Sequence, residues 1–211
     1  MSSHQKSVLV WDPIVRIFHW SLVVSFTVAY LTGEEKNELH IFMGYMVLGL
    51  IIFRVIWGFI GSKHALFENF LTSSPKVFGY LKSLFSNKPK HYLGHNPLGG
   101  WMVIALLMML FAVTFSGLKV YALKEGEGPL SMKIEQLSPI STAYAREDER
   151  QRLVAERDEV GEDYWTEFHE SSTNIMLILI GLHLVGVVVS SKVHKENLVK
   201  AMLTGKKTIQ R

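Results

Sequence analysis

Four long apolar stretches limit the folds open to this chain more than any other feature. They cover residues 13–32, 39–60, 98–120 and 171–191. Each is long enough to cross a hydrocarbon core of about 30 Å, which takes about 20 helical residues. Because the bilayer core offers no water to backbone groups, a single segment that crosses it must be helical. The sequence therefore predicts an all-α integral membrane protein.

Charged residues are nearly absent from these stretches. Only Arg16 and Arg54 lie well inside them, and Lys119 lies at the end of the third. Helices of a soluble bundle carry polar stripes, which are mostly missing here. We therefore expect one domain, residues 1–211, folded as an up-down-up-down four-helix bundle. Its predicted helices cover residues 13–32, 39–60, 98–120 and 168–191, with an outer loop at 121–167 and a cytoplasmic tail at 192–211.

Two further segments have helical potential outside the spans. Between the second and third stretches, the spacing of five apolar residues predicts a short amphipathic helix along the membrane surface: Val77, Tyr80, Leu81, Leu84 and Phe85. Residues 143–159 of the polar outer loop could form a surface helix, although few apolar side chains would anchor it.

Lysines and arginines predict the orientation. They dominate the connection after the second stretch and the tail, whereas Glu34, Glu35 and Glu38 follow the first stretch. By the positive-inside rule both termini are cytoplasmic. No apolar signal core precedes the first stretch, so we expect it to remain as an anchor. The net charge of +3 does not call for a nucleic-acid partner. The basic tail can contact anionic lipid headgroups or act only as a topology signal.

The chain contains no cysteine. This excludes disulfides, thiolate-bound iron–sulfur clusters and covalently attached haem. Any haem would be b-type and held through histidine.

Four histidines lie in or beside the apolar stretches. His169 and His183 are fourteen residues apart on one helix, so about 21 Å separates them on nearly one face. One metal cannot bridge that distance. Expected depth pairs His19 with His183 and His40 with His169, which predicts two six-coordinate iron centres that transfer electrons. The alternative for each histidine alone is a packing residue.

Other residues fit around such centres. Arg54 lies fourteen positions after His40 and could pair with a propionate of the inner haem. Arg16 could do the same or act only as a topology charge. Gly44 would let a flat macrocycle approach the backbone, as would Gly181 and Gly186, although small residues also serve ordinary helix packing.

The remaining histidines are weaker candidates. His91 and His95 have the spacing of a helical metal pair, but Gly94 and the Asn96-Pro97 dipeptide favour a loop. His64 and His194 flank the predicted cytoplasmic interface. They could take part in quinone protonation, or they could simply be solvated.

With these residues identified, the chain resembles the bacterial cytochrome b561 family, which includes the b-type cytochrome subunits of nickel-iron hydrogenases. The resemblance spans nearly the whole chain. It rests on the following segments, together with the tail His194-Lys195-Glu196-Asn197-Leu198-Val199: Val10-Trp11-Asp12-Pro13, Arg16-Ile17-Phe18-His19-Trp20, Leu39-His40-Ile41-Phe42-Met43-Gly44-Tyr45, Phe53-Arg54-Val55-Ile56-Trp57-Gly58, Gly94-His95-Asn96-Pro97, Phe168-His169-Glu170 and Gly181-Leu182-His183.

The resemblance implies a dihaem cytochrome of the bacterial inner membrane that exchanges electrons between quinone and a periplasmic redox partner. The family's haem ligands correspond to His19, His40, His169 and His183. The implied partner is a hydrogenase small subunit or a c-type cytochrome. In one branch superoxide itself donates electrons to quinone, so the chain could be an enzyme in its own right. The acidic outer surface disfavours superoxide. A haem-free membrane protein that binds another metal is the remote alternative.

Overall fold

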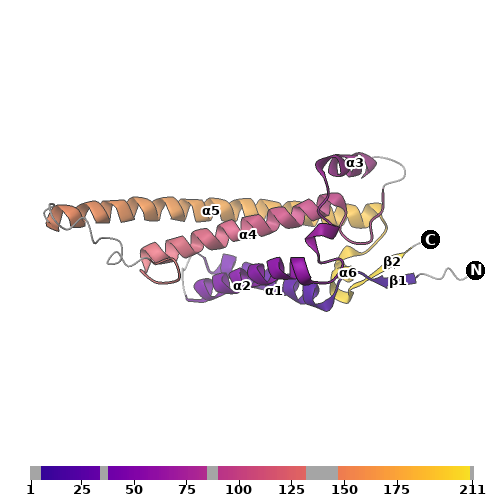
Figure 1. Ribbon diagram of the computed structural model, residues 1–211, viewed down its shortest axis with the longest axis horizontal. Helices are drawn as coiled ribbons and strands as arrows, with labels where there is room; N and C mark the ends of the chain where they lie inside the picture. The colour runs from indigo at the N-terminus through magenta and orange to yellow at the C-terminus, as the bar shows by residue number, and fades with distance from the viewer. Residues whose placement is uncertain (1–5, 34–37, 85–89, 132–146, 210–211) are drawn as a thin grey trace, which may run out of the picture. The chain divides into compact units, whose positions relative to one another are not determined.

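The computed structural model describes residues 6–33, 38–84, 90–131 and 147–209 (Figure 1). It is mainly helical. The elements in chain order are β1 (Lys6–Leu9), α1 (Pro13–Leu31), α2 (Glu38–Ile60), the 3-10 helix η1 (Phe67–Asn69), α3 (Ser74–Leu84), α4 (Pro97–Lys124), α5 (Glu147–Val193), α6 (Leu198–Thr204) and β2 (Lys206–Ile209).

Four helical segments are long and apolar enough to cross a membrane, as the sequence predicts. They are Pro13–Leu31, Glu38–Ile60, Pro97–Lys124 and the Gly161–Val193 part of α5. Between 11% and 22% of the residues in their most apolar windows are buried. Most of the apolar side chains of these helices, such as Ile17 and Leu31, are therefore exposed on the surface. An apolar surface of this extent needs a lipid environment. The chain is therefore a membrane protein.

The chain divides into two compact units. The first contains Met1–Met108 and Leu177–Arg211, and the second contains Met109–Met176. In the first unit α1 packs against α2. The start of α1 is set by Asp12, whose carboxylate accepts a hydrogen bond from the Val15 amide at 2.8 Å, and by Pro13, whose missing N–H costs nothing at this position. The single domain over residues 1–211 stays a prediction.

The last long helix begins much earlier than expected. The predicted outer loop at 121–167 is wrong at both ends, because α4 continues to Lys124 and α5 starts at Glu147. Residues 147–163 are rich in Glu and Arg, which are strong helix formers. An apolar face is not required to extend a helix that a membrane span has already nucleated. The predicted short helix is confirmed as α3, Phe85 lies outside the described residues, and its position along the membrane surface stays a prediction.

A small sheet, which the all-α prediction missed, joins the two ends of the described chain. Strand β1 pairs antiparallel with β2, Lys6 opposite Ile209 and Leu9 opposite Lys206. Beyond the strands, the amides of Val10 and Trp11 both donate to the Gly205 carbonyl, at 2.8 and 3.1 Å. Val10 and Trp11 also form a small core with Ala201 of α6. The segments before α1 and after α6 therefore form one structure.

Candidate functional site

His40 lies in the first turn of α2 and is fixed by α1. Its Nδ1 atom is 2.8 Å from the carbonyl oxygen of Ala29. A carbonyl can only accept, so Nδ1 carries the proton and the lone pair lies on Nε2. Metal-bound histidines usually have this arrangement, in which the second ring nitrogen donates to a backbone carbonyl. Gly33 lies beside the His40 ring, since a Cβ there would be 3.6 Å from the imidazole Cε1.

His169 of α5 has the same type of anchor in the second unit. Its Nδ1 is 2.9 Å from the Val113 carbonyl oxygen of α4 and 3.1 Å from the Ser116 hydroxyl oxygen. Ser116 is completely buried. The ring lies so close to α4 that a Cβ at Gly117 would be 3.1 Å from the imidazole Cε1. His169 is therefore also oriented with its lone pair on Nε2.

His19 and His183 belong together in the first unit but have a different environment. The two imidazoles interact electrostatically, so α1 and the C-terminal part of α5 bring them near each other. The Nδ1 atom of His19 is buried and has no hydrogen-bond partner among the described residues. Trp20 contacts the His19 ring edge-on at a centroid distance of 5.2 Å. A buried, unpartnered imidazole nitrogen is costly unless another group contacts it.

Arg54 is a buried cation in the second half of α2. Its side chain is only 4% exposed, and the guanidinium lies 4.9 Å above the ring of Phe67. Nη2 donates to the Ala65 carbonyl at 3.0 Å, while Nη1 is buried with no acceptor in the described parts of the chain. Asp12 supplies an opposite charge nearby. An unused donor on a buried guanidinium is suited to an anionic oxygen such as a carboxylate.

Arg16 and Gly44 complete the predicted set. The Arg16 Nη1 donates to the Leu203 carbonyl at 2.5 Å, which connects α1 to α6. Its Nε is buried without an acceptor in the described structure. A Cβ at Gly44 would meet nothing within 4 Å, so this face of α2 is open.

No cluster of three or more His, Cys, Asp or Glu side chains able to hold a metal ion occurs within the described residues. His91 and His95 lie in the loop before α4, as their neighbours predicted, and not on one helix face. His91 instead contacts Glu196, with Nε2 and Oε1 2.6 Å apart. The sequence analysis missed Ser116 and Gly117. Their signal was a pair of small residues inside an apolar span, where close helix contacts are common.

Comparison with known proteins identifies the family. The family model for prokaryotic cytochrome b561 matches residues 10–205. The chain belongs to this family. It is 22% identical to a probable Ni/Fe-hydrogenase B-type cytochrome subunit of Rhodobacter capsulatus, over 98% of this chain and 83% of the relative. The corresponding protein of Rhizobium leguminosarum bv. viciae is also 22% identical, over 96% and 90%. No solved structure matches.

Membership makes the chain a b-type cytochrome that transfers electrons in a membrane, and haem b is its cofactor. The described residues fit that group. With no cysteine in the chain, neutral imidazoles would be suitable ligands for the haem iron. Two of them, His40 and His169, have the donor contact on Nδ1 that orients Nε2 for a metal. Arg54 supplies a buried donor suited to an anionic oxygen.

Proposed function

We propose that this cytochrome carries electrons across the membrane through two b haems, each with two histidine ligands, between the quinone pool and a periplasmic redox partner. His19 and His183 hold the inner haem, and His40 and His169 hold the outer one. The matched Nδ1 contacts of His40 and His169 are the observation on which this proposal mainly rests. The electrostatic interaction of His19 with His183 supports the inner pair.

Held by two histidines, a bound haem b would supply reversible one-electron chemistry and would leave no site for oxygen. The chain's own residues determine how well this works. The Ala29 and Val113 carbonyls hold the His40 and His169 rings in one tautomer, so little reorganisation accompanies electron transfer. Arg54 holds a propionate of the inner haem, and its charge offsets that of the carboxylate. Arg16 and Gly44 border the inner and outer haem respectively.

We place the chain in the bacterial inner membrane with both termini cytoplasmic, crossing it up-down-up-down. The β1–β2 pairing supports this arrangement, since it keeps the first and last described residues on one side. The positive residues of the α2–α4 connection and of the tail support the cytoplasm as that side.

The proposed periplasmic partner is a nickel-iron hydrogenase, because the curated relatives are named as subunits of that enzyme. A soluble c-type cytochrome is the second candidate partner. The two are distinguished by mixing purified cytochrome with each protein and following haem reduction at the b-type absorption band. Rapid reduction by hydrogenase and hydrogen, but not by reduced c-type cytochrome, supports the first partner.

The ligand proposal is tested by haem content. His19→Ala and His183→Ala should each lose the same haem, whereas His40→Ala and His169→Ala should each lose the other. Haem per chain is measured by the pyridine haemochrome spectrum, and the haem that remains is identified by its low-temperature absorption and EPR signals. His64→Ala serves as the control and should keep both haems. If a variant of His19 or His183 loses the same haem as a variant of His40 or His169, the assignment is contradicted. Wild-type protein without a b-type spectrum contradicts the function.

A further inference from the structure

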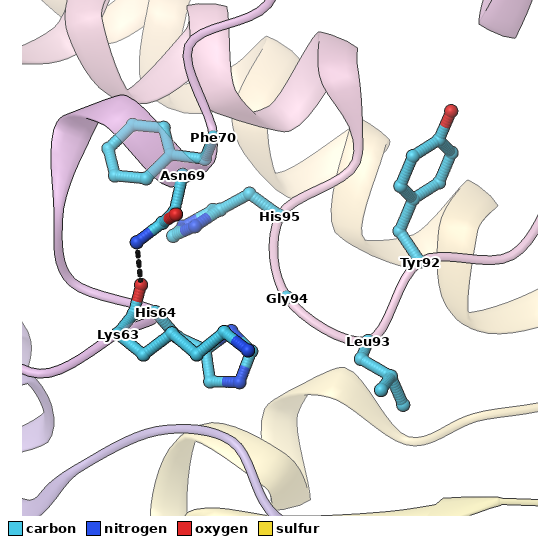
Figure 2. A pocket seen from close by; sticks show the side chains of 8 residues that line it. All are labelled: Lys63, His64, Asn69, Phe70, Tyr92, Leu93, Gly94 and His95. Atoms are coloured by element: carbon cyan, nitrogen blue, oxygen red, sulfur yellow. Dashed lines mark hydrogen bonds between the residues drawn. The ribbon is translucent and has the colours of Figure 1, made fainter.

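A cavity of about 180 Å³ lies in the connection between α2 and α4 (Figure 2). Its polar and aromatic lining comes from His64, Asn69, Phe70, Tyr92 and His95. Figure 2 shows the His95 imidazole extending from its loop toward Asn69, whose amide is held by the Lys63 carbonyl at 2.7 Å. Sites for drug-sized ligands start at about 300 Å³. This cavity is therefore suited to a single substituted ring.

The His95 side chain offers an unused polar atom at this cavity. Its ring is held between Trp11 and Phe70, with centroid distances of 4.6 and 4.7 Å. The Nδ1 atom is buried and lacks a partner within the described structure. Burial, together with the positive charges of Arg54 and Lys207, lowers the pKa of His95 to about 3. His95 is thus neutral at physiological pH, and a neutral imidazole can form a hydrogen bond to a carbonyl or hydroxyl oxygen.

The opposite wall has similar chemistry. His64 lies next to Gly94, where a Cβ would come 3.0 Å from the His64 Nδ1. Burial and the neighbouring Lys63 and Lys207 lower the pKa of His64, which favours its neutral form. Two neutral imidazoles on one small cavity offer hydrogen bonds to ligand oxygens, and Lys63 in the cavity lining, with Arg54 and Lys207 nearby, adds positive charge that stabilises electron-rich oxygens.

The cavity is also close to the proposed inner haem ligands. His95 interacts electrostatically with His183 and with Arg54. All of these residues belong to the first compact unit. A ligand beside His95 would therefore lie in the same unit as the proposed inner haem ligands His19 and His183.

A series of titratable side chains leads from the cavity to the surface. The Tyr92 ring contacts the buried Tyr80 ring at a centroid distance of 5.7 Å, and the Tyr80 hydroxyl lies 3.3 Å from His194 Nε2. The His194 ring is 5.3 Å from that of His91, whose side chain is 39% exposed. Within this series Tyr80 and His194 are within hydrogen-bond distance, while Tyr92–Tyr80 and His194–His91 are neighbours through ring contacts.

Glu196 closes this series. One carboxylate oxygen contacts His91 at 2.6 Å, and the other lies 3.3 Å from the ammonium of Lys207, which is itself buried. This fixed carboxylate holds His91 beside His194. We define the proton series as Tyr92, Tyr80, His194, His91 and Glu196.

We propose that the cavity binds the ring of a quinone, that His95 and His64 hydrogen-bond its two oxygens, and that the proton series exchanges protons between these oxygens and water. The inference rests on the proposed quinone-linked function. Reduction adds two electrons and two protons: one O–H bond forms at each ring oxygen, and the ring becomes aromatic. The electrons come one at a time from the periplasmic donor through the haems. Quinol oxidation reverses every step.

The binding step is tested with a radiolabelled decyl-substituted benzoquinone by equilibrium dialysis against the oxidised holoprotein. His95→Leu and His64→Leu should each weaken binding at least tenfold. His95→Gln keeps a hydrogen-bonding group and should lose less. Lys82→Ala on α3, outside the cavity and the proton series, is the matched control and should bind normally. Haem content identifies any variant that fails to fold. If His95→Leu fails to fold, His64→Leu still tests the cavity. Unchanged binding in both variants with normal haem overturns the cavity assignment.

The proton step is tested by stopped-flow oxidation of the reduced haems. Tyr80→Phe should bind the quinone normally but react at least fivefold more slowly, with a larger solvent isotope effect. Oxidation by ferricyanide, which takes up no protons, should be unchanged. Equal quinone rates in Tyr80→Phe and wild type overturn the proton series. If reduced wild-type protein does not react with the quinone at all, the quinone-linked function fails instead.

Discussion

The Nδ1 atom of His169 lies 2.9 Å from the carbonyl oxygen of Val113, so a helix backbone fixes the tautomer of a proposed haem ligand. His40 has the equivalent contact with Ala29 at 2.8 Å. His19 differs, because its buried Nδ1 has no partner among the residues that the structure describes. The two proposed haems therefore differ in how firmly the protein holds their ligands.

Gly117→Val should disrupt the proposed outer haem. Even one added Cβ would lie 3.1 Å from the His169 Cε1 and 3.4 Å from Nδ1, so Gly117→Ala moves the ring slightly and the branched valine moves it further. We expect Gly117→Val to lose one haem of the two, and Gly117→Ala to keep both with a changed EPR g-value for one of them. Gly49→Val is the control, since a Cβ there meets nothing within 4 Å. Equal haem content in both valine variants would contradict a close His169 contact.

Arg54→Met should weaken retention of the inner haem. Methionine keeps an apolar stem beside Phe67 but removes the buried charge and the unused Nη1 donor. Haem transfer to excess apomyoglobin measures retention, and we expect at least a tenfold faster loss of one haem. Arg54→Lys keeps the charge and should be intermediate. The thermal unfolding midpoint of each variant shows whether the lost Ala65 contact, rather than the propionate, explains the change.

Gly205→Ala should loosen the sheet that joins the chain ends. Gly205 has a φ of +79°, and its Cβ would lie 2.6 Å from the Trp11 carbonyl oxygen. Strain of this kind costs about 1–3 kcal/mol. Trypsin should therefore cleave after Lys206 and Lys207 at least fivefold faster, as followed by mass spectrometry. Gly126→Ala has a similar φ of +67° without the contact and should leave this cleavage unchanged.

Much of the fold could be predicted, because an apolar run of bilayer length has one backbone solution. The small sheet could not. Its strands Lys6–Leu9 and Lys206–Ile209 are short, and their pairing is held by a glycine turn and by the Trp11 contact. A helix at 143–159 was considered, but its continuity with the last span as α5 was missed, since helix propensity is a weak guide where burial does not support it.

The site was predictable only in part. The spacing of His169 and His183 is a property of the chain alone and suggests two centres. The backbone carbonyls that anchor the histidines cannot be read from the sequence, because every residue has a carbonyl. Only the packing of α1 on α2 brings the Ala29 carbonyl to His40. His95 was considered as one of a metal pair and as part of the family segment Gly94-His95-Asn96-Pro97, and not as a cavity residue. Its position between Trp11 and Phe70 depends on contacts distant in sequence.

The stability of the part of the first unit around His95 should depend on His95 below neutral pH. Burial lowers the pKa of His95 from 6.5 to about 3 in the folded protein. Between these values the unfolded chain binds the extra proton, so stability is complete above about pH 6.5 and falls as the pH falls. His95→Phe keeps an aromatic ring between Trp11 and Phe70 and removes this titration. From pH 8 to pH 5 the wild type should lose more unfolding free energy than the variant, by on the order of 1 kcal/mol. Thermal unfolding in detergent across this range measures the difference. Parallel pH profiles for the two proteins would show that His95 is solvated in the folded state.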